Sequence, residues 1–149
     1  MKTLPVLALL VAVTACTKDA APAAKGPSGD EYAVSLAPKA PYSAGKEATV
    51  TLNLAAKQGY HVNPDYPMAF KPQGHSGVQF EGPNLKLTWG AKTPCTEKPE
   101  DACAVEVPIA VTPEKAGPAV VAGLVSFSVC NPEHCRIEKL ALSLPIEVQ

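Results

Sequence analysis

The chain has 149 residues, enough for one domain of ordinary size once a targeting segment is set aside. It carries 13 Lys and Arg against 14 Asp and Glu, and this near-balance argues against a nucleic-acid-binding or polybasic membrane-surface protein. With 46% hydrophobic and 18% charged residues, a mostly disordered chain is excluded. The 16 prolines and 10 glycines favour short strands and turns over long helices.

Residues 1–15 have the features of a bacterial secretion signal. Lys2 supplies a positive charge, and residues 4–13 form an apolar run too short for a stable transmembrane helix, which needs about 20 residues. The run leads into Val13-Thr14-Ala15-Cys16, which resembles a lipobox, the recognition site of lipoprotein signal peptidase. That resemblance implies a mature chain that begins at a diacylated Cys16. The alternative is an ordinary cleaved signal with Cys16 as a bystander.

The next segment, up to Asp30, is rich in Ala, Pro, Lys, Gly and Ser and shows no apolar periodicity. Residues 16–30 are therefore predicted to be the lipidated cysteine and a flexible tether. Thr17 stands where an Asp would retain an enteric lipoprotein in the inner membrane, so this resemblance favours the outer membrane. The expected location is the cell envelope, with the chain lipid-anchored and facing the periplasm.

Residues 31–149 show the period-two alternation of apolar side chains that is typical of strands. Four segments carry it most clearly, at 49–54, 102–111, 119–129 and 140–148. Pro108 and Pro145 interrupt two of them and cannot donate to a ladder, so we expect both at edge, bulge or outward-facing positions. Strands spaced in this way by dense turn residues predict an all-β fold, an immunoglobulin-like antiparallel β-sandwich.

Four cysteines remain after Cys16 is assigned to lipid, and a secreted bacterial chain lies where disulfides form. They allow three connectivities, of which sequence proximity favours Cys95–Cys103 and Cys130–Cys135. The first pair encloses a polar surface loop, and we interpret it as a structural disulfide worth ~2–3 kcal/mol in loop entropy. The second pair flanks a four-residue turn that begins with Asn131-Pro132, where another thiolate can attack it easily.

The segment Phe127-Ser-Val-Cys130-Asn-Pro-Glu-His-Cys135 resembles the cysteine hairpin of the N-terminal periplasmic domain in the thiol:disulfide interchange protein DsbD family. Gly59-Tyr60-His61-Val62-Asn63 resembles a Gly-aromatic-His-hydrophobic segment of that domain, and residues 105–111 resemble the strand before its hairpin. The resemblance covers residues 32–148. It implies an immunoglobulin-like domain in which Cys130 and Cys135 form the redox pair.

The same resemblance implies partners. The pair would take electrons from a membrane thiol reductase, acting in trans, and pass them to periplasmic thioredoxin-like proteins. In the family a cap loop shields the pair, and its position corresponds here to residues 89–102, which hold Cys95 and Cys103. The chain departs from the family at Arg136-Ile137, where two prolines are common.

Three functions follow, in order of preference. The first is a lipid-anchored thiol–disulfide exchange module, an oxidoreductase that needs no cofactor. The second is a non-catalytic interaction lipoprotein of the envelope stapled by two disulfides. The third is copper binding through Cys130, His134 and Cys135, with Met68 and His61 as further ligands.

Overall fold

The computed structural model describes residues 24–74 and 77–149, and all regular structure within them is β-strand. In chain order the strands are β1 (Ala24–Ser28), β2 (Tyr32–Pro38), β3 (Ala48–Ala56), β4 (His61–Val62), β5 (Ala69–Pro72), β6 (Val78–Gln79), β7 (Leu85–Lys86), β8 (Ala91–Pro94), β9 (Ala102–Pro113), β10 (Gly117–Cys130) and β11 (Cys135–Val148). Among these residues no helix has the length and hydrophobicity needed to span a membrane.

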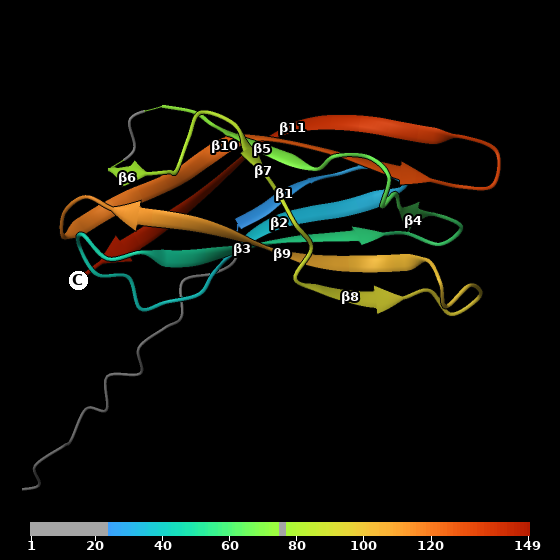
Figure 1. Cartoon of the computed structure of the whole chain (residues 1–149), viewed down its shortest axis with the longest axis horizontal. Helices are drawn as coiled ribbons and strands as arrows, with labels where there is room; N and C mark the ends of the chain where they lie inside the picture. The colour runs from blue at the N-terminus through green and yellow to red at the C-terminus, as the bar shows by residue number, and fades with distance from the viewer. Residues whose placement is uncertain (1–23, 75–76) are drawn as a thin grey trace, which may run out of the picture.

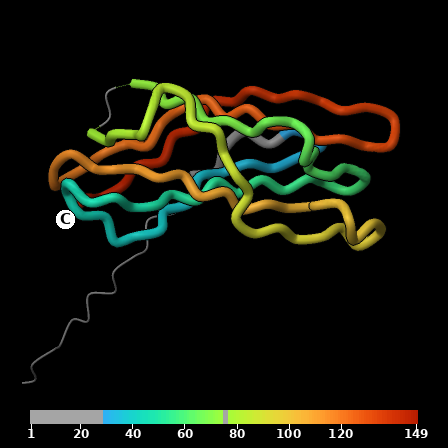
Figure 2. Tube along the Cα trace, viewed as in Figure 1, coloured from blue at the N-terminus to red at the C-terminus, as the bar shows by residue number. Residues whose placement is uncertain are grey.

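The strands pack in two layers (Figures 1 and 2). One layer contains β2, β3, β9 and β8, and the other contains β11, β10, β5 and β7, with every neighbouring pair antiparallel. The short strand β4 pairs with β9 at Val62↔Ala102 and with β10 at Cys130↔His61, so it joins the layers. At the opposite end, Tyr42 forms an isolated bridge with Val148 of β11. The predicted immunoglobulin-like antiparallel sandwich is confirmed.

The core lies between the layers and is built from the alternating positions that the sequence identified. Along β3 the residues Val50, Leu52 and Leu54 are buried, and along β9 every second residue from Val105 is buried, with more exposed neighbours between them. Tyr32 of β2 and Phe127 of β10 meet across the layers, with ring centroids 5.0 Å apart in an edge-to-face arrangement. Pro145 is exposed on β11, whose one ladder partner among the described residues is β10, so Pro145 occupies one of the predicted edge positions.

The sheet begins earlier than the sequence predicts. Residues 24–28 form β1, which pairs antiparallel with β2 at Ala24↔Leu36 and Lys25↔Ser35, although they fall inside the predicted tether of residues 16–30. Ala-Lys-Gly-Pro-Ser has no apolar alternation, and an edge strand needs only backbone partners, so no pattern marks it. The signal segment 1–15, Cys16 and the first part of the tether lie outside the described residues.

One buried hydroxyl has no hydrogen-bond partner among the described residues. Ser128 of β10 is 2% exposed, and its Oγ is unsatisfied. A buried hydroxyl without a partner loses its hydrogen bonds to water on folding and gains none in return, which destabilises the folded state. We therefore expect Ser128→Ala to raise the free energy of unfolding by about 1 kcal/mol in urea denaturation. Ser126→Ala, two residues earlier on the same face, is the matched control and should change it by less than about 0.5 kcal/mol. A loss of stability in Ser128→Ala alone would show that the hydroxyl has a partner, such as a bound water.

Candidate functional site

The hairpin of β10 and β11 ends in a disulfide. The two strands run in register from Gly117↔Val148 to Cys130↔Cys135, and Cys130 and Cys135 are bonded, with their Cα atoms 4.0 Å apart. The next pair outward carries a backbone hydrogen bond, from Asn131 N to the His134 carbonyl at 2.9 Å. The cysteines therefore occupy a non-hydrogen-bonded position, where opposite Cα atoms approach most closely.

Asn131 organises the four-residue turn between the cysteines. Its Oδ1 accepts hydrogen bonds from the backbone N–H groups of Glu133, at 2.9 Å, and His134, at 2.8 Å. This is the local bonding that makes Asn favourable at the start of a turn, and Pro132 fixes the next φ angle. The turn predicted from Asn131-Pro132 is present, and these two hydrogen bonds stabilise it.

The two cysteines differ strongly in exposure. Cys130 is only 5% exposed because β10 is flanked here by β11 on one side and by His61 of β4 on the other. Cys135 is exposed because β11 is an edge strand with β10 as its single ladder partner in the described chain. A thiolate from solvent therefore meets Cys135 first.

The second disulfide closes the loop between β8 and β9. Cys95 and Cys103 are bonded, with a Cα–Cα distance of 4.8 Å, and both residues are partly exposed. Within the loop, Cys95 N donates to the Asp101 carbonyl and Asp101 N to the Lys98 carbonyl, each at 3.0 Å. The two disulfides are thus the pairings that sequence proximity favours.

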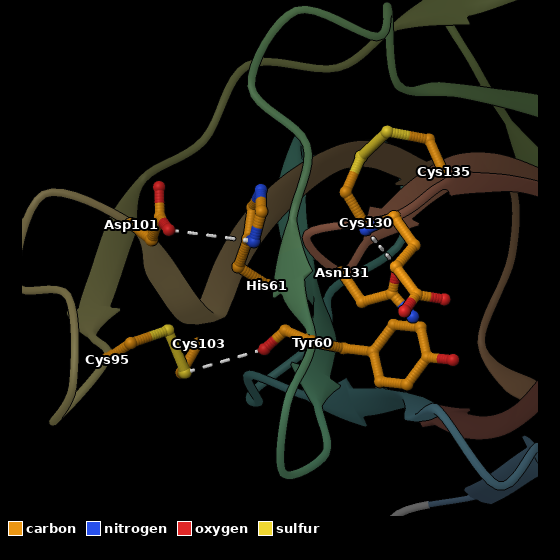
Figure 3. A network of polar contacts seen from close by, with 9 residues as sticks. Tyr60, His61, Cys95, Asp101, Cys103, Cys130, Asn131 and Cys135 are labelled. Carbon is orange, nitrogen blue, oxygen red and sulfur yellow. Dashed lines mark hydrogen bonds and ion pairs between the residues drawn. A yellow bond between two sulfur atoms is a disulfide. The ribbon is translucent and has the colours of Figure 1, made fainter.

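Strand β4 lies between the two disulfides (Figure 3). On one side the Tyr60 carbonyl oxygen is 3.7 Å from Cys103 Sγ, and His61 Nδ1 is 3.6 Å from Asp101 Oδ2. The sulfur of a disulfide has no hydrogen, so the first approach is a contact and not a hydrogen bond. On the other side the Tyr60 ring stands edge-on to His134, with centroids 6.4 Å apart. Tyr60, which the sequence analysis did not identify as functional, thus lies next to Cys103 through its carbonyl and next to His134 of the hairpin turn through its ring.

A pocket of about 410 Å³ opens beside β4, between the Cys95–Cys103 loop and the tip of the hairpin. It is lined by Gln58, Gly59, Tyr60, His61, Cys95, Thr96, Glu97, Lys98, Asp101, Cys103 and Pro132. The resemblance implied that residues 89–102 would cap the redox pair. The structure differs, because this segment lies across β4 from the pair and leaves Cys135 exposed.

Charged side chains tie the hairpin to β2. The Arg136 guanidinium contacts the Glu31 carboxylate through Nη1 and lies 3.1 Å from Glu138 Oε1 through Nη2. The attraction of Glu31, followed by its hydrogen bond and then by Glu138, raises the pKa of Arg136. Burial raises the pKa of the nearby Tyr32 hydroxyl, and Glu138 adds to that shift. Arg136 therefore links β11 to the residue just before β2.

The copper site suggested by the sequence is not assembled. Cys130 and Cys135 are bonded to each other, and Met68 is buried at 4% exposure. Over residues 24–74 and 77–149, no group of three or more His, Cys, Asp or Glu side chains is arranged to hold a metal ion. The described residues therefore define a sandwich that carries two disulfides and no metal cluster of this kind.

Comparison with known proteins adds little to this description. No family model matches the chain, and no curated protein matches it. Among solved structures the chain is similar to the ASH / PapD-like domain of human CEP192 (PapD-like domain 7), with 18% identity and a TM-score of 0.31, over 97% of this chain and 100% of that one. The antiparallel sandwich is defined by the strand pairings of this chain.

Proposed function

We propose that the chain is a lipid-anchored thiol–disulfide exchange module of the bacterial envelope, with Cys130 and Cys135 as its redox pair. The observation that carries this proposal is the disulfide at the tip of the β10–β11 hairpin, with Cys135 exposed and Cys130 buried. Exposed disulfides are the ones that exchange most readily. The resemblance of residues 127–135 to the DsbD cysteine hairpin supports the same function.

The difference in exposure assigns the order of steps in this proposal. The thiolate of a reducing partner attacks Cys135 Sγ and forms a mixed disulfide, while the bond to Cys130 breaks and Cys130 leaves as a thiolate. A second thiol of the partner then attacks its own sulfur in the mixed disulfide and releases Cys135. The partner is oxidised to a disulfide, and both cysteines are reduced. In the reverse direction, Cys135 attacks the disulfide of an acceptor and Cys130 resolves the intermediate.

The proposed partners follow from the resemblance. A membrane thiol reductase would donate electrons in trans, and periplasmic thioredoxin-like proteins would accept them. Anchoring by lipid at Cys16, with the outer membrane as the favoured site, would keep the domain at the envelope. Two or more acyl chains make such an anchor stable, whereas a single chain binds only marginally.

The test is a redox titration of each cysteine pair. The full chain, solubilised in detergent, is equilibrated in glutathione buffers of graded potential, then alkylated and mapped by peptide mass. We expect Cys130–Cys135 to be reduced, in the folded protein, at potentials well above about −300 mV, the range below which structural disulfides usually lie. The proposal fails if this bond stays oxidised until the chain unfolds.

One observation favours the second candidate, a binding lipoprotein. Ile137 on β11 is 59% exposed, and strand alternation places it on the same face as Cys135. A partner protein seated on this face would bury the Ile137 side chain, and that burial favours association. A reduction-resistant Cys130–Cys135 bond, in a protein that loses partner binding when Ile137 is changed to Ser, would establish this candidate in place of exchange.

A further inference from the structure

The disulfide between Cys95 and Cys103 forms part of the wall of the 410 Å³ pocket. Both residues are partly exposed, whereas Cys130 of the other pair is buried. The volume lies in the range of pockets that bind small molecules. A small molecule that enters this pocket therefore lies next to the Cys95–Cys103 disulfide.

The two disulfides cannot exchange with each other in this fold. Strand β4 separates them, since His61 pairs with Cys130 on β10 and Val62 pairs with Ala102 on β9. Each step between neighbouring strands is about 4.8 Å, so β9 and β10 are roughly 10 Å apart here. Exchange requires one sulfur to attack another directly. A reductant of Cys95–Cys103 must therefore come from outside the chain, and the pocket gives it an approach to this bond.

The pocket wall carries more negative than positive side chains. Glu97 and Asp101 contribute two carboxylates, and Lys98 contributes one ammonium group. Asp101 lies beside His61, at 3.6 Å, while Glu97 makes no ion pair in the described chain. This lining attracts a cationic group more than an anionic one.

We infer that Cys95–Cys103 is a second thiol-exchange site, which takes a small amino thiol from the pocket. The inference goes beyond the proposed function and does not depend on it. In the reaction, the thiolate of one amino thiol bonds to one cysteine sulfur, the S–S bond breaks, and the other cysteine leaves as a thiolate that takes a proton. A second amino thiol attacks the bound thiol's sulfur, which releases the remaining cysteine. Two amino thiols are oxidised to their disulfide, and two cysteines are reduced.

The structure offers a partner for the reduced state. Cys103 Sγ lies 3.7 Å from the Tyr60 carbonyl oxygen, within reach of a hydrogen bond in which sulfur is the donor. Once Cys103 is a thiol, its S–H can donate to this oxygen. The existing contact thus becomes a hydrogen bond between the loop and the segment before β4 when the disulfide is lost, and this bond favours the same loop position in both redox states. In the oxidised state the disulfide closes the loop, which is the structural role that the sequence predicts for it.

The test compares two small thiols on the full chain. Cysteamine, a cationic thiol, and 2-mercaptoethanesulfonate, an anionic one, are each added to the folded, oxidised protein in detergent. The reaction is quenched with acid, and reduction of each bond is followed by alkylation and peptide mass mapping. For each disulfide, the rate constant with cysteamine is divided by the rate constant with 2-mercaptoethanesulfonate. The ratio at Cys130–Cys135 is the internal reference, because the intrinsic reactivities of the two thiols affect both ratios equally. We expect the cysteamine preference to be about three times larger at Cys95–Cys103, and to fade at high salt.

A charge variant locates the effect. Glu97→Gln removes the unpaired carboxylate of the pocket and should lower the cysteamine preference at Cys95–Cys103 about twofold, with no change at Cys130–Cys135. Glu147→Gln, on an exposed position of β11 near the other end of the sandwich, is the matched control and should leave both ratios unchanged. The inference is overturned if Cys95–Cys103 stays oxidised in the folded chain, or if its preference equals that of the other bond. Neither result contradicts the proposed function. That function is contradicted only if Cys130–Cys135 resists reduction.

Discussion

Cys130→Ser is expected to trap a redox partner as a stable mixed disulfide, and Cys135→Ser is expected to trap at least tenfold less. In the first variant the exposed Cys135 is kept, and this chain has no Cys130 thiol left to resolve the complex. In the second, the remaining thiol is Cys130, which is 5% exposed between β11 and β4 and cannot be reached by a protein partner. The probe is a thioredoxin variant that keeps only its attacking cysteine, activated as a thionitrobenzoate mixed disulfide, so that Cys135 displaces thionitrobenzoate and the partner has no thiol to resolve the complex. Non-reducing gels measure the complex.

The contrast has a built-in control. Both variants keep the Cys95–Cys103 bond, so a variant lacking Cys130 and Cys135 together gives the background. In urea the burial of Cys130 is lost, and the two single variants should then react with iodoacetamide at similar rates. Equal trapping by the folded variants would show that burial does not order the steps. Preferential trapping by Cys135→Ser would reverse the assignment of the attacked cysteine.

Gly123→Ala should destabilise the domain by about 3 kcal/mol, at the upper end of the usual cost of overpacking a core. A Cβ added at Gly123 of β10 would overlap the ring of Phe70, with Cε1 only 2.7 Å away, and would also lie 2.7 Å from the Lys71 carbonyl oxygen. The ring is fully buried, and the carbonyl belongs to β5, which pairs with β10 at this point. Neither neighbour can move without breaking the core or the ladder. Urea denaturation of the oxidised protein measures the change.

Two further variants separate the causes. Gly82→Ala is the control, because an added Cβ there meets no atom within 4 Å, and we expect a change below about 0.5 kcal/mol. Phe70→Leu shortens the side chain that blocks Gly123, so Gly123→Ala should cost less in that background than in the wild type. The rescue should be partial, since the Lys71 carbonyl remains. An additive double variant would show that Phe70 is not the obstacle.

Long strands could be predicted from the sequence, whereas short ones could not. The segments 49–54, 102–111, 119–129 and 140–148 alternate over enough residues for a period of two to be visible, and they lie in β3, β9, β10 and β11. Strands β4, β6 and β7 have two residues each, too few for any period. Their positions follow from the longer strands that they pair with, and not from their own composition.

The candidate site shows the same division. The spacing of the cysteines and the Asn131-Pro132 turn were enough to predict the Cys130–Cys135 bond and the hairpin around it. The difference in exposure between its cysteines could not be predicted, because Cys130 is buried by the pairing of β10 with His61, about 70 residues earlier in the chain. The pocket could not be predicted from the sequence for the same reason, since its walls come from three segments that are separate in the sequence.

The connections between the layers determine how the molecule responds to force and denaturant. At one end β4 is hydrogen-bonded to both layers, and at the other the Tyr42–Val148 bridge joins them again, reinforced by the hydrogen bond from Gln149 N to the Tyr42 carbonyl at 2.9 Å. Sheets that touch only through side chains can slide past each other, but here sliding would break backbone bonds at both ends. We therefore expect the two layers to unfold together as one cooperative unit.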